Sequence, residues 1–232
     1  MEIQYGNSLK GINEWEKEMG LIRIRANHVL LFRKDYQIAK RIFDIIVSLI
    51  AMPFFLLLMG LIALAIYVDD PGPIFFTQKR TGKGGKRFGM YKFRTMLKNA
   101  EELKAKYAHL NEHTWPDFKI TNDPRVTRVG NFLRKTSLDE IPQIINVLKG
   151  EMSLVGPRPT SFAADTYSLW HTERLEVLPG ITGLWQVSGR KELDFNDRLR
   201  LDIEYIYRQS FWFDIWILVL TVGSVITRKG AE

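Results

Sequence analysis

The sequence contains no cysteine, which excludes disulfide bonds, thiolate catalysis and cysteine-ligated zinc. Histidine is scarce as well, and the spacing of the histidines does not match that of metal ligands, so each is expected on the surface or in packing contacts. These residues are His28, His109, His113 and His171. The sequence also shows no internal repeat, low-complexity tract or cleavable signal-peptide pattern.

Acidic residues are in the minority, because 26 Asp and Glu face 33 Lys and Arg. The resulting net charge of +7 favours an anionic partner, such as nucleic acid, a phospholipid surface or a phosphorylated substrate. The length of 232 residues is enough for one sizeable domain with accessory elements.

One long apolar run covers residues 42–68. It exceeds the roughly 20 residues that a helix needs to span a bilayer, so we expect membrane contact. Asp44 lies one turn from Lys40 and Arg41, and we expect it to pair with them near the lipid headgroups. Pro53 interrupts the run and leaves two halves, each rather short to cross alone.

The flanks of this run decide its expected topology. Lys and Arg cluster at positions 33–41, and residues 71–100 contain further Lys and Arg but no acid. The positive-inside rule therefore places both flanks in the cytoplasm. A helix that enters the membrane, bends at Pro53 and returns to the same face satisfies this rule. The alternative is an ordinary Pro-kinked helix that spans the bilayer.

A β-hairpin is expected next, because residues 74–78 and 88–93 have strand composition and a Gly/Lys turn joins them. Lys92 and Arg94 alternate with Tyr91 and Phe93 and therefore share one face. They suit either a diphosphate or lipid headgroups. Residues 100–110 then have the pattern of an amphipathic solvent helix.

The stretch 134–159 contains two adjacent carboxylates, Asp139 and Glu140, where a helix is expected to begin. Ser137 or Asp139 is suited to the N-cap, since the apolar positions that follow have helical spacing. Gly150 is expected to end this helix. A carboxylate at a helix N-terminus is kept ionised by the free N–H groups and the helix dipole.

Two arginines flank the acids: Arg134 lies upstream, and Arg158 lies downstream between Pro157 and Pro159 in a turn expected to be stiff. An anionic nucleophile surrounded by fixed guanidinium groups suits phosphoryl chemistry. The structural alternative is ordinary capping, because residues 137–140 also fit the capping-box pattern.

The C-terminal part contains a Gly-punctuated segment in which Trp185, Gln186 and Arg190 supply a stacking ring, an amide and a cation. These groups suit a nucleotide or a sugar, although the segment is also typical of a tight loop. Residues 161–176 and 193–208 are expected to be helical. Residues 211–226 are apolar and aromatic but short for a span, which favours an interfacial helix over a buried core helix.

Taken together and in this order, these blocks resemble the bacterial sugar transferase family of monotopic phosphoglycosyl transferases, which start glycoconjugate assembly on polyprenyl phosphate. The resemblance covers about residues 38–226. Its motifs are Lys40-Arg41-x-x-Asp44 with Pro53, Gly72-Pro73-x-x-Phe76-x-Gln78, Lys92-Phe93-Arg94-Thr95-Met96, Leu133 to Gln143, Asn146 to Gly150, Met152 to Pro159 and Pro179 to Gly183. Larger members carry a further N-terminal membrane region, which the weakly patterned first 35 residues here are not expected to supply.

The resemblance implies transfer of a sugar 1-phosphate from a UDP-sugar to undecaprenyl phosphate, with release of UMP. It implies that Asp139 is the nucleophile that forms a covalent phospho-sugar intermediate, and that Asp139 and Glu140 hold Mg²⁺. Phosphate contacts are implied for Lys92, Arg94, Arg134 and Arg158, with Pro157 in the same substrate-binding turn. Contacts to the nucleotide or sugar are implied for Gln186 and Arg190. The sequence of residues 183–190 resembles that of members that transfer a hexose 1-phosphate, which favours galactose or glucose as the transferred sugar.

The expected fold is therefore α+β and mainly helical, membrane-associated and monotopic, with a Pro-bent re-entrant helix, a small β-hairpin and interfacial amphipathic helices. We expect an N-terminal cytosolic extension over 1–37, the membrane helix over 38–70 and a catalytic domain over 71–232, on the cytosolic face of the bacterial inner membrane. Membrane phospholipids are expected partners and nucleic acid is not; homodimer formation stays open. The alternative function is a membrane-anchored basic binding protein without catalysis.

Overall fold

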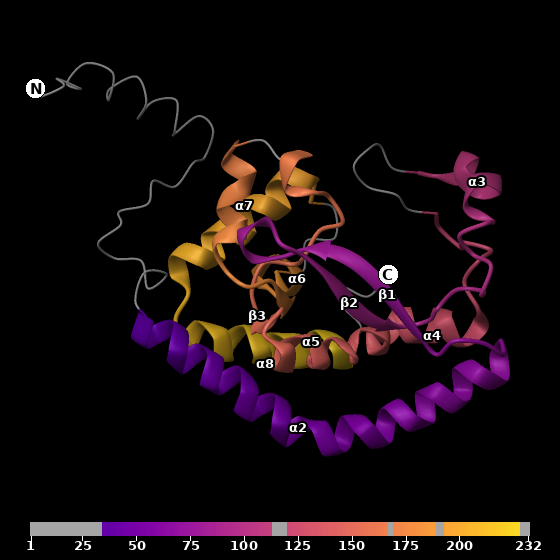
Figure 1. Ribbon diagram of the computed structural model, residues 1–232, viewed down its shortest axis with the longest axis horizontal. Coiled ribbons are helices and arrows are strands. Elements are labelled where there is room, and N and C mark those ends of the chain that lie inside the picture. Colours follow the sequence, from indigo (N-terminus) through magenta and orange to yellow (C-terminus); the bar gives the residue numbers. More distant parts are fainter. Residues whose placement is uncertain (1–33, 113–119, 167–168, 189–192, 228–232) are drawn as a thin grey trace, which may run out of the picture.

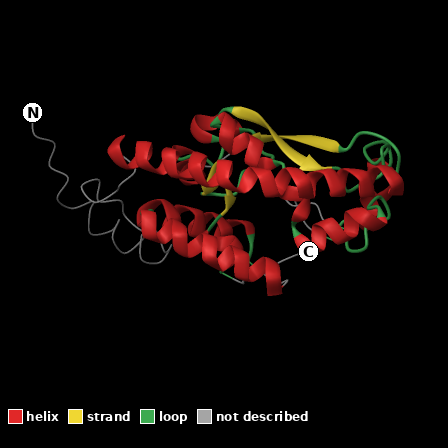
Figure 2. Cartoon of the chain, turned by 90° about the horizontal axis from the view of Figure 1, so that it is seen from below, coloured by secondary structure: helices red, strands yellow, loops and turns green. Residues whose placement is uncertain are grey.

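The computed structural model describes residues 34–112, 120–166, 169–188 and 193–227. Within these ranges the chain is mainly helical, with two small two-stranded sheets, and this confirms the expected α+β class. Figure 2 shows how small a share of the chain the strands contribute. The expected extension over residues 1–37 lies almost entirely outside the described residues.

The longest element is α2, a continuous helix over Lys34–Asp69 that contains Pro53. Figure 1 shows α2 running along one side of the molecule and bending near its middle. An internal proline removes one helical hydrogen bond and bends the helix, so Pro53 accounts for the bend. Among the described residues, α2 is the one helix that is long and apolar enough to cross a membrane.

The two faces of α2 differ sharply. One face packs on the rest of the chain through Asp44, Ser48, Met59, Ile62 and Ile66. The other face leaves large apolar side chains exposed, and these are Ile42, Ile46, Leu49, Ile50, Phe54, Leu57, Leu61, Leu64 and Val68. So much exposed apolar surface on one helix indicates association with a membrane.

The expected hairpin is present as β1 (Phe75–Thr81) and β2 (Arg87–Phe93), joined through the 3₁₀ turn η3 (Lys83–Gly85). The strands are antiparallel, with Phe76 opposite Lys92 and Arg80 opposite Phe88. The helix expected over 100–110 is much shorter. Only α3 (Lys104–Tyr107) and the 3₁₀ turn η4 (Ala108–Leu110) form there.

The central stretch folds as α4 (Arg128–Thr136), the 3₁₀ turn η5 (Leu138–Glu140), α5 (Gln143–Lys149) and β3 (Ser153–Val155). Gly150 ends α5 in the left-handed conformation with φ 82°, as expected for a helix C-cap.

The C-terminal part contains the 3₁₀ elements η6 (Ala164–Thr166) and η7 (Leu169–Glu176), so the prediction of an α-helix over 161–176 was wrong. The strand β4 (Gly180–Thr182) pairs in parallel with β3, an interaction that the sequence patterns did not predict.

Three helices complete the chain: α6 (Leu184–Val187), α7 (Phe195–Arg208) and α8 (Phe211–Thr227). The last two match their predicted positions. In α8, Asp214 and Ile217 are buried, whereas Trp212 and Trp216 are exposed. A helix with one buried and one aromatic exposed face is typical of an interfacial location.

The hydrophobic core has two parts. One lies among α5, β3, α7 and α8 and includes Val147, Val155, Ile206 and Ile217. The other joins the C-terminal half of α2 to Phe93 and Leu133. The acid-bearing turn η5 touches this second part, because Leu138 and Ile141 pack against it.

Candidate active site

Asp139 and Glu140 lie on η5, the short turn between α4 and α5. The prediction that Ser137 or Asp139 caps the following helix was wrong: the Ser137 side chain makes no capping hydrogen bond, Asp139 lies inside η5, and α5 begins after Pro142. Ser137 instead has φ 55° and ends α4, where its N–H donates to the carbonyl of Arg134 at 3.2 Å. A left-handed residue reverses the chain direction at a helix end. The acids therefore stand at a sharp corner.

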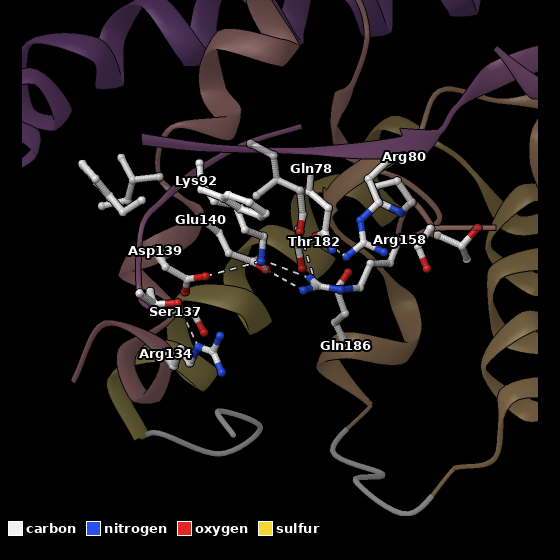
Figure 3. Close-up of a pocket in the computed structure, with 18 of the residues that line it drawn as sticks. Gln78, Arg80, Lys92, Arg134, Ser137, Asp139, Glu140, Arg158, Thr182 and Gln186 are labelled. Atoms are coloured by element: carbon white, nitrogen blue, oxygen red, sulfur yellow. Dashed lines mark hydrogen bonds and ion pairs between the residues drawn. The ribbon is translucent and has the colours of Figure 1, made fainter. Parts of the chain in front are cut away.

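Lys92 and Arg158 converge on this acid pair (Figure 3). The Lys92 Nζ lies 2.8 Å from Glu140 Oε1 and 3.3 Å from Asp139 Oδ2. Arg158 approaches Glu140 with both terminal nitrogens, at 2.5 and 3.2 Å. The predicted grouping of Asp139, Glu140, Lys92 and Arg158 is thus present in space. We call these four residues the cleft cluster.

The surroundings shift the pKa values of the two carboxyl groups of the cleft cluster in opposite directions. Burial raises the pKa of Asp139, with a further upward contribution from Glu140, and Lys92 only partly opposes this. Burial also acts upward on Glu140, but Arg158 and Lys92 outweigh it and hold the pKa of Glu140 far below its usual range. The surroundings therefore favour the ionised form of Glu140, whereas the charge of Asp139 is less well compensated.

Buried contacts place Lys92 and Arg158. In α5, Asn146 accepts from the Tyr91 N–H at 3.0 Å and donates to the Gly89 carbonyl at 2.8 Å, which joins β2 to α5. The Arg174 guanidinium donates to the Arg158 carbonyl and, at 2.5 Å, to Asp202 Oδ2. The sequence analysis missed these positioning residues, because each acts through a contact distant in sequence.

Pro157 does not point into the cleft but belongs to the packed turn that presents Arg158. Its carbonyl accepts from the Gly180 N–H at 2.9 Å. A Cβ placed on Gly180 would lie 2.1 Å from the Gly156 nitrogen, so only glycine fits there. The two Gly-containing motifs of the sequence therefore meet in space and support one turn.

Arg94 and Arg134 lie near the cleft but make other contacts. Arg94 binds Asp70, with Nη1 2.8 Å from Asp70 Oδ2. Arg134 Nε donates to Thr95 Oγ1 at 3.0 Å, and Figure 3 places its side chain beside Asp139. Arg134 thus remains close to the acid pair, whereas the buried guanidinium of Arg94 is held by Asp70.

The cleft cluster, Arg94 and Arg134 border one open cleft of about 1290 Å³. Two of its polar side chains escaped the sequence analysis: Gln78 and Arg80 on β1, whose side chains form a 2.6 Å hydrogen bond. The alternation of side chains along a strand could have identified them, because Phe76 pairs with Lys92 and the alternate positions 78 and 80 lie on the same face of the hairpin. Gln186 also borders the cleft and donates to the Ile181 carbonyl at 3.3 Å. Arg190 lies outside the described residues.

The described residues contain no group of three or more His, Asp or Glu side chains that would hold a metal ion by themselves. Asp139 and Glu140 offer two adjacent carboxylates. Mg²⁺ commonly takes one or two protein carboxylates and completes its shell with water and substrate phosphates. The donor set therefore fits Mg²⁺ that arrives with a phosphorylated ligand.

The fold and site define a membrane-associated protein with a carboxylate pair in a cationic cleft. The chain belongs to the bacterial sugar transferase family, which matches residues 35–228.

Three relatives illustrate the family. The galactosyl transferase CpsE of Streptococcus agalactiae is 43% identical over 206 residues, 87% of this chain and 45% of the relative. An undecaprenyl-phosphate galactose phosphotransferase of Salmonella typhimurium is 43% identical over 223 residues, 92% and 45% of the two chains. The exopolysaccharide production protein ExoY of Sinorhizobium fredii is 38% identical over 205 residues, 84% and 88%. The chain thus spans about half the length of the first two and most of ExoY.

Proposed function

We propose that this protein is a phosphoglycosyl transferase that moves a sugar 1-phosphate from a UDP-sugar to undecaprenyl phosphate and releases UMP. The observation that carries this proposal is the cleft cluster, in which a weakly compensated Asp139 lies beside cations suited to phosphate. Family membership and the relatives named as undecaprenyl-phosphate transferases support it. The reaction begins polysaccharide or glycoconjugate assembly at the cytosolic face of the inner membrane.

The proposed reaction has two displacements at one phosphorus atom. A carboxylate oxygen of Asp139 attacks the phosphorus that bears the sugar, and the bond between this phosphorus and the bridging oxygen breaks, so UMP leaves with that oxygen. A phosphate oxygen of the lipid then attacks the same phosphorus and breaks its bond to Asp139. This regenerates the carboxylate and gives the lipid diphosphate sugar, and it implies ping-pong kinetics.

The cations of the cleft have distinct roles in this proposal. Arg158 reaches Glu140 with two nitrogens and can offer the same fork to a phosphoryl group, which a lysine cannot reproduce. Lys92 lies within ion-pair distance of both carboxylates, and its ammonium group would neutralise charge on the transferred phosphoryl group. Arg134 adds charge beside Asp139. Arg94 is held in an ion pair with Asp70, so its role in this proposal is to shape the wall of the cleft.

Mg²⁺ held by Asp139, Glu140 and the substrate phosphates would supply charge neutralisation. Glu140 is suited to this because it stays ionised. We further propose galactose or glucose as the sugar. Relatives are named for galactose, for glucose and, at 38% identity, for N-acetylgalactosamine, so a donor panel is needed.

For the membrane, we propose that α2 enters and leaves on the cytosolic face through its bend at Pro53. The absence of cysteine permits a direct test. Lys34→Cys and Asn99→Cys place single thiols at exposed positions before and after the apolar segment. Both should react with an impermeant maleimide only from the cytosolic side. Labelling of the two from opposite sides would establish a spanning helix instead.

Intact-protein mass spectrometry tests the chemistry. Enzyme in detergent or nanodiscs is mixed with Mg²⁺ and a panel of UDP-sugars, without lipid acceptor. A mass gain of one hexose phosphate that is absent in Asp139→Asn would support the covalent route and identify the sugar. Turnover with lipid but no adduct would favour direct attack. Neither an adduct nor turnover with lipid would favour the alternative function, a basic membrane-anchored binding protein without catalysis.

A further inference from the structure

Two adjacent carboxylates stand at the C-terminal end of the long apolar helix. Asp69 is the last residue of α2 and Asp70 follows it, and the last turn of α2 contains no basic residue. Negative charge is unfavourable at this end of a helix, because the helix dipole is negative there. Neither charge therefore stabilises α2 itself, and the side-chain hydrogen bonds of both residues go to other parts of the chain. We call Asp69 and Asp70 the helix-end acids.

Asp69 caps the helix that leads to the acid pair of the cleft. Its Oδ2 accepts a hydrogen bond from the Val129 N–H at 2.9 Å, in the first turn of α4. The Thr127 side chain accepts from the Gly130 N–H of the same turn, also at 2.9 Å. The Asp69 charge thus lies at the positive end of α4, where it is favourable. Figure 1 shows the end of α2 beside α4.

Asp70 holds the segment that follows β2, the strand of Lys92. Its Oδ2 lies 2.8 Å from Arg94 Nη1 and accepts from the Lys98 N–H at 3.2 Å. Its backbone carbonyl accepts from the Arg94 guanidinium as well. Arg94 is only 7% exposed, so its partner is fixed by the fold. Because Lys92 precedes Arg94 by two residues, Asp70 also restrains the end of the strand that carries Lys92.

The segment after β2 and α4 also contact each other directly. The Thr95 carbonyl accepts from the Thr127 N–H at 3.1 Å, and Thr95 Oγ1 accepts from Arg134 Nε at 3.0 Å. A Cβ placed on Gly130 would lie 2.0 Å from the Thr95 carbonyl oxygen, so α4 approaches this closely only with glycine there. The end of α2, the start of α4 and the segment after β2 therefore form one packed joint.

We infer that the helix-end acids are positioning residues that set the separation of Lys92 from Asp139, an inference that rests on the proposed function. Neither acid borders the cleft, so both act through other residues. The helix α4 has nine residues and ends at Ser137, two residues before Asp139. A tilt of roughly 5° at the start of this helix, which is about 13 Å long, moves its other end by about 1 Å. A displacement of this size is sufficient to slow a reaction that requires a precisely placed nucleophile.

The first test separates the rate of adduct formation from donor binding. Asp69→Ala and Asp69→Asn are compared with Asp194→Ala, a matched control that removes the side chain capping α7, where Asp194 accepts from the Asp197 N–H at 2.7 Å. Each protein in detergent is mixed with Mg²⁺ and increasing concentrations of the UDP-sugar that gives the adduct. The rate of adduct formation per folded molecule is measured by mass spectrometry, and the thermal midpoint is recorded.

The maximal rate should fall about tenfold in Asp69→Ala. The UDP-sugar concentration for half of this rate should change by less than about twofold, because Arg158, the proposed phosphate fork, is held by Arg174 instead. Asp69→Asn keeps an oxygen that accepts from the Val129 N–H, so it should retain most of the rate. Asp194→Ala should lower the thermal midpoint about as much as Asp69→Ala does but leave the rate unchanged.

The second test measures the joint without any substrate. Since the chain has no cysteine, Lys79→Cys and Asn131→Cys place two spin labels at exposed positions, on β1 and on α4. The distribution of distances between the labels should be narrow in the otherwise unsubstituted protein. It should shift or broaden when Asp69→Ala or Asp70→Ala is added and stay unchanged with Asp194→Ala.

An unchanged maximal rate in Asp69→Ala, or an unchanged label distance in both acid variants, would overturn the inference. An equal loss of rate in Asp194→Ala would do the same, since it would indicate general destabilisation. A higher half-saturating concentration at an unchanged maximal rate would assign Asp69 to donor binding and also contradict it. If the unsubstituted protein forms no adduct, the proposed function itself fails, while the label distances still decide whether the helix-end acids position α4.

Discussion

Among the buried charges of the described residues, two clusters are built from similar residues but differ in how their acids are held. The cleft cluster joins Asp139, Glu140, Lys92 and Arg158. A second set, which we call the anchor cluster, consists of Lys40, Arg41 and Asp44 of α2 together with Asp214 of α8, and it joins α2 to the rest of the chain. Each contains acids that are at most 14% exposed in their side chains and a lysine close to a carboxylate.

The anchor cluster uses fixed partners. Lys40 Nζ lies 2.6 Å from Asp214 Oδ2, and the Tyr205 hydroxyl donates to the same carboxylate at 2.7 Å. Asp44 accepts from Ser153 Oγ at 2.7 Å and from the Leu154 N–H at 3.2 Å. The prediction that Asp44 pairs with Lys40 and Arg41 was therefore wrong.

Arg41 completes the anchor by donating to the carbonyls of Val147 and Leu148 at 2.5 and 3.0 Å. These carbonyls belong to the last turn of α5, where a cation interacts favourably with the negative end of the helix dipole. The membrane helix thus holds the end of α5 and, through Asp44, the start of β3. The acid pair and Arg158 lie just outside these two elements.

The difference between the clusters lies in what satisfies the acids. In the anchor cluster, Asp44 accepts hydrogen bonds from a hydroxyl and a backbone N–H that the fold holds in place, and it is only 1% exposed. In the cleft cluster, the flexible side chains of Lys92 and Arg158 balance the acids and can turn to an arriving phosphate. We propose that the anchor cluster stabilises the fold, whereas the cleft cluster exchanges its partners when a phosphorylated ligand binds. Four variants test this distinction.

The largest effect is expected from Asp139→Asn, which keeps the shape of the side chain but removes the nucleophile. Transferase activity should fall by a factor on the order of 10³ or more. The thermal midpoint in detergent should stay near that of the unsubstituted protein. A large loss of stability with residual activity per folded molecule would remove Asp139 from the reaction.

The opposite pattern is expected from Asp214→Ala in the anchor cluster. This change leaves the Lys40 ammonium and the Tyr205 hydroxyl without their carboxylate, and removal of one partner of a buried pair costs about 3–5 kcal/mol. The midpoint of chemical denaturation should fall accordingly, while the adduct still forms in the folded fraction. An unchanged midpoint would show that the anchor does not stabilise the fold.

Arg158→Lys is expected to have an intermediate effect, since it keeps the charge but loses the two-nitrogen fork. The kcat/KM for the UDP-sugar should fall about tenfold to a hundredfold. Arg200→Lys, at an exposed ion pair with Asp197, is the matched control and should change nothing. Equal behaviour of the two variants would exclude a specific role for the Arg158 fork.

The smallest effect concerns pH. Burial and the Glu140 charge raise the pKa of Asp139, so adduct formation should lose rate on acidification at a higher pH than an ordinary aspartate would give. Glu140→Gln removes the like charge, and the acidic limb of the profile should move to lower pH. The measurement is the rate of adduct formation against pH in both proteins; a limb that moves upward contradicts the assignment.

The sequence by itself determined the elements whose cause is local. The alternating strands and Gly/Lys turn predicted the hairpin, the apolar periodicity predicted α7 and α8, and Gly150 predicted the end of α5. The flanking arginines also predicted a cationic site around Asp139 and Glu140, whereas only the family resemblance implied that Lys92 belongs to it. Turn residues and side-chain periodicity act over a few residues, so they are readable without the fold.

The tertiary structure alone decided which partners the charges take. Asp44 binds Ser153, Arg94 binds Asp70, and β3 pairs with β4 across 25 or more residues of chain. It also decided that Ser137 ends α4 in the left-handed conformation and gives no side-chain cap to the turn that follows. Several partners are chemically equivalent for any one charge, and only the packing of α2, α5 and α8 selects among them, because a buried charge must take a partner within hydrogen-bond reach.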